Sequence, residues 1–166
     1  MSARALAIEP LTREGFAPFG DVIESEGRPH HPINAGTAQR YDDLAKLDVA
    51  ESGGRAQISL CRAEPVALPL RLRLMERHPL ASQAFIPLSA TPFLIVVAPP
   101  TETLDLAAIR AFRSNGRQGI NYRRGTWHHP LLALERVSDF VIVDRSGAGA
   151  NCDEIPIAER GIVLGL

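Results

Sequence analysis

The sequence predicts a single all-β domain, a sandwich or barrel with a few short helices. Short apolar or alternating segments recur at spacings of roughly ten residues, with Gly, Pro, Asn or Ser between them. The 166 residues are 45% hydrophobic and 22% charged, which is ordinary for a globular protein of this size. We find no linker, internal repeat or low-complexity tract, so residues 1–166 are expected to form one domain.

The N-terminal third is expected to be mostly irregular. Thr12 can cap one helical turn, "REGF", and "DVIES" has the composition of a strand. Residues 27–40, "GRPHHPINAGTAQR", are predicted to be a long loop because they contain Gly, Pro and Asn. Residues 41–54 are expected to hold a short helix that ends at a Gly-Gly pair.

The remaining chain is expected to consist largely of strands. The segments with strand patterns are "RAQISLCRAE", "LRLRLMERH" at 70–78, "QAFIPL", "FLIVVA" at 93–98, "GINYR", "LLALERV" and "DFVIVDR". A short helix capped by Asp105 is predicted at 105–112, and Asn115-Gly116 predicts a turn. The tail "SGAGANCDEIP" is predicted to be a loop.

Charge and cysteine content exclude several classes of protein. The net charge is 18 − 19 = −1, so a general nucleic-acid binder is not expected. Lys46 is the only lysine, and the excess of arginine suits a small anionic substrate, although genomic composition is the better explanation. Two distant cysteines and no signal peptide predict the cytoplasm. The longest apolar run, "FLIVVA", is too short to span a bilayer.

Two segments carry residues that can bind a metal. In "MERHPLASQAF", Glu76 and His78 lie two apart and point to the same face of a strand, and Gln83 begins the next strand. Far downstream, "RRGTWHH" places His128 three residues after Gly125. Glu, His and Gln are all possible ligands of a first-row divalent metal. A barrel can collect such ligands at its mouth from neighbouring strands.

This spacing resembles the two-part signature of the cupin superfamily. Its first motif is His-x-His followed by a Glu, and its second is Gly-x-x-His. Glu76 stands at the first His, His78 matches the second, and Gln83 replaces the Glu, while Gly125 and His128 match the second motif. The resemblance implies a double-stranded β-helix, or jelly-roll barrel, with a divalent metal held by Glu76, His78, Gln83 and His128.

Longer strings extend the likeness to nearly the whole chain. They are, in order, "FGDVIE", "INAGTAQRYDDLA", "ERHPLASQAFIPL", "NGRQGINYRRGTWHHPLLAL", "DFVIVDRSG" and "NCDE". Together they closely resemble the ureidoglycolate lyase family. That resemblance implies a carbon–nitrogen lyase that cleaves (S)-ureidoglycolate to glyoxylate and urea in allantoin breakdown. It also implies a cytoplasmic homodimer that nickel stimulates.

The chemistry of this reaction suggests roles for particular residues. Histidine titrates near neutral pH, so His78 and His128 can move protons, assisted by His129 or Tyr122. Arginine can grip a carboxylate with two hydrogen bonds, which makes Arg73, Arg124 and Arg62 candidates. Gln83 can contact the substrate as well as a metal. Asn34 reaches it if its loop folds over the barrel mouth or over a partner subunit.

Each of these residues also has a structural explanation. His78 can satisfy backbone groups at a strand end, and Glu76 can pair with a neighbouring arginine. Because adjacent strand residues face opposite ways, His128 and His129 are not expected to share the pocket, and the spacing favours His128. Two other functions stay open. One is a ureidoglycolate amidohydrolase that releases ammonia, and the other is a non-catalytic cupin that binds a small acid.

Overall fold

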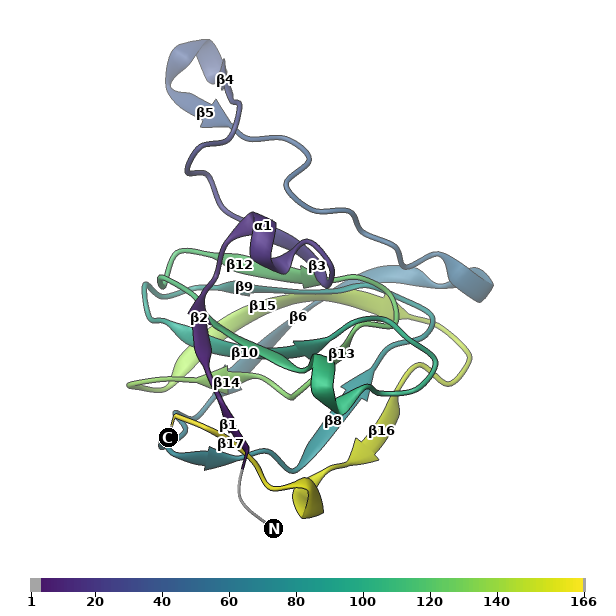
Figure 1. The fold of residues 1–166 in the computed structure, drawn as a ribbon. Helices are drawn as coiled ribbons and strands as arrows, with labels where there is room; N and C mark the ends of the chain where they lie inside the picture. The colour runs from purple at the N-terminus through teal and green to yellow at the C-terminus, as the bar shows by residue number, and fades with distance from the viewer. Residues whose placement is uncertain (1–3, 166) are drawn as a thin grey trace.

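A computed structural model describes residues 4–165 and confirms the all-β prediction (Figure 1). Two sheets face one another across the core. One sheet contains, in spatial order, β3 (Gly20–Ile23), β12 (Gly119–Tyr122), β9 (Gln83–Pro87), β15 (Ser138–Ser146) and β6 (Arg55–Ala63). The facing sheet contains β16 (Asp153–Pro156), β8 (Leu74–Arg77), β13 (Trp127–His128), β10 (Phe93–Ala98), β11 (Arg110–Arg113) and β2 (Ile8–Pro10), with β14 (Leu132–Ala133) also paired to β10.

The strand pairs show that the chain is one long hairpin rolled into a barrel. Outward from the connection between β10 and β11, the successive antiparallel pairs are β10 with β11, β9 with β12, β8 with β13, and β6 with β15. These pairs lie alternately in the two sheets. That alternation is the jelly roll, or double-stranded β-helix, which the cupin resemblance predicts.

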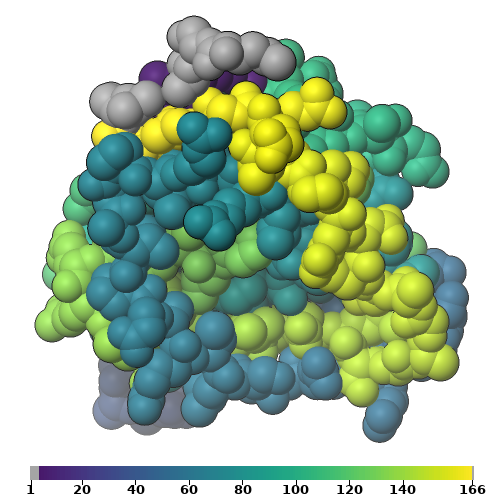
Figure 2. Space-filling model, turned by 90° about the horizontal axis from the view of Figure 1, so that it is seen from below, coloured from purple at the N-terminus to yellow at the C-terminus, as the bar shows by residue number. Residues whose placement is uncertain are grey.

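A third, smaller sheet closes the lower end of the barrel. It contains β1 (Arg4–Leu6), β17 (Ile162–Leu164) and β7 (Leu70–Arg71). Figure 2, which views the molecule from below, shows the C-terminal segment in yellow lying across this end beside teal residues of the chain's middle. The turn η4 (Ala158–Arg160) joins β16 to β17 in that segment.

The run "FLIVVA" forms β10, and all six of its residues are buried. Phe93, Ile95 and Val97 pack in one apolar cluster, whereas Leu94, Val96 and Ala98 pack in the other. A strand covered on both faces has no need for the polar alternation of a half-exposed strand. One cluster is rich in aromatic rings, and Phe16 from the helix α1 (Arg13–Phe16) lies fully buried in it. Thr12 caps that helix as predicted, since its hydroxyl accepts a hydrogen bond from Gly15 N.

The helix predicted over 41–54 is wrong. Only the turn η2 (Glu51–Gly53) forms, and the residues before it have no regular secondary structure. We call residues 44–50 the strap. Its backbone bonds to the body of the protein instead of to itself. Lys46 N donates to Asp21 Oδ2, and Asp48 N donates to Ser82 Oγ. These tertiary hydrogen bonds replace the bonds that a helix would have made.

Three other local predictions need correction. The helix expected at 105–112 is only the turn η3 (Leu106–Ala108), although Asp105 caps it, because the following residues pair with β10 as β11. The tail expected to be a loop contains β16, which pairs with β8. The strand expected at 70–78 is broken into β7 and β8, because Leu72 and Met75 are both fully buried and the alternation changes phase between them.

The loop predicted at 27–40 contains a small hairpin that projects from the body (Figure 1). It consists of β4 (His31–Ile33), the turn η1 (Asn34–Gly36) and β5 (Ala38–Arg40). We call residues 28–43 the arm. Arg28 Nη2 donates to Asp43 O across its base, and most of its side chains are exposed. Within residues 4–165, none of the helices has the length and apolar character needed to cross a bilayer.

Candidate functional site

Four predicted ligands come together inside one end of the barrel. Glu76 on β8 lies directly opposite His128 on β13, and His78 follows β8 on the same side. Gln83 begins β9 in the facing sheet. Gly125 adopts a positive φ of 76°, and its N–H donates to His78 O at 2.9 Å. The glycine turn therefore ties the two sequence motifs to each other, as their spacing suggested.

Both histidines are oriented by backbone carbonyls. His78 Nδ1 lies 2.7 Å from Asn151 O, and His128 Nδ1 lies 2.9 Å from Thr126 O. A carbonyl can only accept, so each Nδ1 carries a proton, and in the neutral ring Nε2 carries the lone pair. The two rings are 5.1 Å apart between centroids. Orientation through the second ring nitrogen is typical of histidines that bind metals.

His128 Nε2 is buried without a hydrogen-bond partner among the described residues. It lies 3.3 Å from Glu76 Oε1 without hydrogen-bond alignment, so the lone pair of the neutral ring faces the carboxylate. A buried nitrogen left in this state costs free energy unless another group binds it. This orphaned atom is the clearest indication in the cluster of a missing ligand.

Gln83 extends the cluster to an acidic residue. Its Nε2 donates to Asp144 Oδ2 at 3.3 Å, and Gln57 Nε2 donates to Asp144 Oδ1 at 2.8 Å. Because the carboxylate only accepts, Gln83 must turn its Oε1 the other way, where it lies 3.1 Å from His78 Nε2. Two lone pairs cannot face each other at that distance. Gln83 Oε1 and His78 Nε2 therefore face each other at the site as a hydrogen-bonding pair.

Electrostatics favour an ionised glutamate beside a neutral histidine. His128 lowers the pKa of the Glu76 carboxyl, and burial opposes that shift only in part. Burial lowers the pKa of His128, outweighing the attraction of Glu76. Tyr122 stacks on His128 with centroids 4.2 Å apart, and burial, followed by the charge of Glu76, raises its pKa well above the usual range. Its hydroxyl therefore stays protonated.

The cluster fits a divalent metal. One ligand atom each from Glu76, His78 and His128 can be chosen so that all three lie within 4.8 Å of one another. Two imidazoles with a carboxylate suit first-row metals, and Gln83 Oε1 adds a fourth oxygen beside them. A second grouping of Glu76 with Cys152 and Glu154 lies next to it, on the more exposed side.

Other predicted site residues lie elsewhere or have other partners. Arg124 forms ion pairs with Asp48 at 2.6 Å and Glu51 at 2.9 Å, and Arg62 pairs with Asp139. Arg73 is exposed, and Asn34 lies in the turn of the arm. His129 follows the end of β13, with its Nδ1 2.9 Å from Pro130 O, and burial lowers its pKa. The four residues other than His129 have no contact with the histidine pair among the described interactions, whereas His129 lies within electrostatic reach of Glu76 and His128.

Sequence reasoning missed Asp144, Gln57 and Asn151. Asp144 had a usable signal, because it continues the alternation of Phe140 and Ile142 and so points inward from an apolar strand. A charge at an inward position requires a partner. Cavities of 210 to 470 Å³ elsewhere on the protein are lined by other residues. The cluster is identified by its chemistry, since ligands around a metal pack closely and leave little open volume.

Comparison with known proteins gives one consistent family. The family model described as ureidoglycolate lyase matches residues 3–164. Proteins named ureidoglycolate lyase from Pseudomonas entomophila and Pseudomonas putida are 58% and 55% identical over 161 residues, covering 97% of this chain and 96% of theirs. The protein of that name from Burkholderia mallei is 54% identical over 156 residues, which are 94% of this chain and 91% of that protein.

Solved structures give fainter likenesses. One is RmlC from Streptococcus suis in complex with dTDP-D-xylose, with a TM-score of 0.47, 10% identity, and coverage of 87% of this chain and 74% of that one. Another is a dTDP sugar isomerase from Desulfovibrio desulfuricans, with a TM-score of 0.48, 14% identity, and coverage of 84% and 86%.

Proposed function

The chain belongs to the ureidoglycolate lyase family, and on this premise we propose that it cleaves (S)-ureidoglycolate to glyoxylate and urea at the cluster of Glu76, His78, Gln83 and His128. The observation that carries this assignment to particular residues is the buried, partnerless Nε2 of His128 facing an ionised Glu76. The substrate is small and anionic, and its reacting carbon bears a hydroxyl group and a urea nitrogen.

The reaction requires two proton movements and no water. The hydroxyl proton leaves, its oxygen forms the C=O of glyoxylate, and the C–N bond breaks. The departing nitrogen takes up a proton and leaves as urea. A base near the hydroxyl and an acid near the nitrogen are therefore sufficient, each within hydrogen-bonding reach.

The two sides of the cluster divide these tasks. Glu76 is ionised and His128 is neutral, so this side accepts the hydroxyl proton. On the other side, His78 Nε2 lies 3.1 Å from Gln83 Oε1, and this nitrogen is the proposed proton donor to the urea nitrogen. Asp144 fixes the amide of Gln83, and the protonated Tyr122 holds the plane of the His128 ring by stacking.

We further propose that Glu76, His78, Gln83 and His128 hold a divalent metal, with nickel as the ion that the family resemblance suggests. The orphaned His128 Nε2 and the inward Gln83 Oε1 are the atoms whose chemistry fits such an ion. A bound divalent ion lowers the pKa of a coordinated hydroxyl and neutralises a carboxylate. Both roles of His78 would use Nε2, since Nδ1 bonds to Asn151 O. His78 can therefore act as the acid or bind the metal, but it cannot do both at once.

Metal analysis distinguishes these roles. We expect protein purified without chelators to contain close to one equivalent of a first-row metal, and His128→Asn protein to contain far less. Elemental analysis measures the content, and activity before and after dialysis against a chelator measures the dependence. Full activity in metal-free protein would leave the acid role to His78 and remove the metal from the proposal.

A product assay tests the proposed function itself. Purified protein incubated with (S)-ureidoglycolate is expected to release urea and glyoxylate in equal amounts, with no ammonia. An amidohydrolase would release ammonia, since water would attack the ureido carbonyl. A non-catalytic cupin would bind the substrate without turnover. Either of these two results would replace the lyase assignment.

We propose that the protein is a homodimer formed through the outer face of the five-stranded sheet. Ile58 and Leu60 on β6 are 77% and 74% exposed. They pair with Val143 and Val141 on β15, whose neighbours Phe140 and Ile142 face the core, so the four side chains form an outward apolar patch. Such a patch beside a free strand edge favours association. The arm projects on this same side (Figure 1), and a two-stranded hairpin is marginal alone.

The double variant Ile58→Lys with Leu60→Lys is expected to be monomeric, because charges placed in the patch oppose its burial. Sedimentation velocity of this variant and of the parent protein measures the change. The matched control is Leu68→Lys, an exposed leucine beside Gly165 at the lower end of the barrel, which is expected to leave the dimer intact. A dimer that persists in the double variant would place the interface elsewhere.

We also propose that the protein is located in the cytoplasm, because both of its cysteines are free.

A further inference from the structure

Two buried polar atoms without a hydrogen-bond partner lie outside the proposed catalytic cluster. Among residues 4–165, buried side-chain nitrogen or oxygen atoms without a hydrogen-bond partner occur at three positions, His128 Nε2, Asn121 Oδ1 and Arg124 Nε. The first belongs to the cluster described above. The other two residues line one cavity of about 210 Å³. An unmet donor and an unmet acceptor in the same cavity indicate a bound polar molecule.

The cavity lies between the outer face of the five-stranded sheet and the strap. Asn121 on β12 is 1% exposed, and its Nδ2 donates to Asp21 Oδ2 and to Lys46 O, each at 3.0 Å. Both partners are acceptors, so the orientation of the amide is unambiguous and Oδ1 is left without a donor among the described residues. Lys46 N also donates to Asp21 Oδ2. The strap and β3 therefore hold the amide of Asn121 in place, and no described residue donates a hydrogen bond to its Oδ1.

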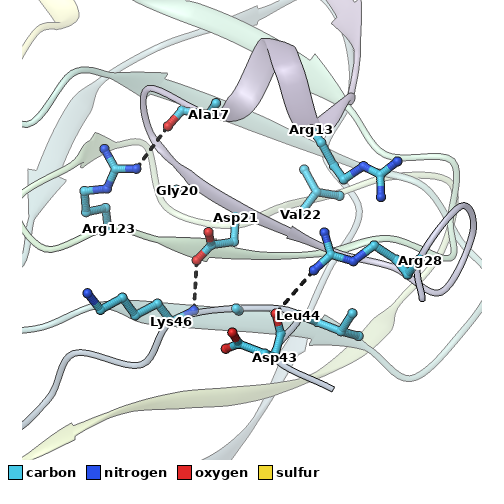
Figure 3. A pocket seen from close by; sticks show the side chains of 11 residues that line it. Arg13, Ala17, Gly20, Asp21, Val22, Arg28, Asp43, Leu44, Lys46 and Arg123 are labelled. Atoms are coloured by element: carbon cyan, nitrogen blue, oxygen red, sulfur yellow. Dashed lines mark hydrogen bonds between the residues drawn. The ribbon is translucent and has the colours of Figure 1, made fainter. Parts of the chain in front are cut away.

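The donor is fixed in a similar way. Arg124 Nη1 donates to Glu51 and Nη2 donates to Asp48, whereas the buried Nε has no hydrogen-bond partner among the described residues. Lys46 and Arg123 complete the positive side of the lining. Neither has an ion-pair partner among the described residues, and the side chain of Arg123 donates only to Ala17 O. Figure 3 views the adjoining cavity and shows the Lys46 side chain running toward the side where Arg123 lies.

We propose that this cavity binds a small carboxylate that also carries an O–H or N–H donor, that is, a hydroxy or ureido acid. Its carboxylate accepts from Arg124 Nε and balances Lys46 and Arg123, and its hydroxyl or N–H donates to Asn121 Oδ1. Asp48 and Glu51 already pair with Arg124, so Lys46 and Arg123 are the lining cations that an anion can approach. The cavity itself carries this inference, which does not rest on the proposed lyase activity.

The cavity and the catalytic cluster lie on opposite faces of the same strands. Asn121 precedes Tyr122 on β12, and Ser82 in the cavity precedes Gln83 at the start of β9. Adjacent residues on a strand point to opposite faces. The two sites are therefore separate, and a ligand in the cavity does not contact Glu76, His78 or His128.

Calorimetric titration with glycolate tests the proposal, because glycolate is the smallest acid with a donor beside its carboxylate. We expect two binding sites in the unmodified protein, one of which disappears in His128→Asn. In Lys46→Met, the other site is expected to weaken at least tenfold, the size of effect typical of losing a charged hydrogen-bonding group. The matched control Arg117→Met removes one exposed positive charge outside the cavity and is expected to change neither site.

A second variant, Asn121→Leu, removes the proposed acceptor and is expected to weaken glycolate binding. Two further ligands, acetate and urea, test which groups of glycolate are recognised. Acetate lacks the donor and urea lacks the charge, so both are expected to bind the cavity at least tenfold more weakly than glycolate. A crystal soaked in glycolate is expected to show the acid between Asn121 and Arg124. Density for water alone there, or unchanged glycolate affinity in both Lys46→Met and Asn121→Leu, would overturn the proposal. Failure of the lyase assay would leave the expectations for this cavity unchanged, so the two proposals can fail separately.

Discussion

His128→Ala is expected to lower kcat/KM for ureidoglycolate by about 10²- to 10⁴-fold, the range typical of losing a proton-transfer group. His128 is buried at 2% exposure, its Nδ1 is fixed by Thr126 O, and its Nε2 faces Glu76. The alanine variant removes the partner of Glu76 and one proposed metal ligand together. Steady-state kinetics with urea detection measures the loss.

Two further variants show whether that loss is specific. His128→Asn keeps a polar side chain of moderate size, so near-native circular dichroism with lost activity would exclude simple unfolding. His129→Ala removes the neighbouring histidine, whose Nδ1 bonds locally to Pro130 O. We expect a loss of less than about tenfold there, since strand alternation assigns the site to His128. Equal losses in both alanine variants would contradict that assignment.

Phe16→Ala is expected to lower the free energy of unfolding by about 3–5 kcal/mol, as is usual for deleting a buried aromatic ring. Phe16 is fully buried and contacts Phe112 and Phe19 with centroid distances of 5.7 and 5.8 Å. It also lies 6.3 Å from Tyr122, which stacks on His128. The cavity left by Phe16 therefore opens directly behind the aromatic support of the catalytic cluster. Urea denaturation followed by tryptophan fluorescence measures the change.

The matched control for Phe16→Ala is Leu88→Ala. Leu88 is 59% exposed, and its truncation is expected to change the free energy of unfolding by less than about 0.5 kcal/mol. A similar small effect from Phe16→Ala would mean that the aromatic cluster does not determine stability. If Phe16→Ala remains folded, reduced activity with unchanged metal content would indicate that Tyr122 had shifted.

The parts of the fold that the sequence predicted are those with a local signal. The six apolar residues of β10 are buried on both faces, and the pairing of Glu76 with His128 follows from the two cupin-like motifs and the Gly125 turn. These features depend on residue type and short spacing, both of which are visible in the chain. Gln83 is likewise predicted from its spacing after His78 along the sequence.

The features that sequence reasoning missed have no local signal of this kind. Asn151 orients His78 through its main-chain carbonyl, a group that almost every residue possesses, so its identity reveals nothing. The strap has a helical composition, but its backbone bonds to Asp21 and Ser82, which lie far away in the sequence. Tertiary contacts of this type override the local preference of a segment.

The rolled hairpin also constrains how the protein folds during its synthesis. Its outermost pair, β6 with β15, joins Arg55 to Ser146, so most of the chain must be present before that pair can form. High contact order of this kind slows folding, because loop closure precedes the contacts that repay it. His78 acquires its carbonyl partner only when Asn151 has been synthesised. During translation, the nascent chain therefore carries both histidines long before it contains a working site.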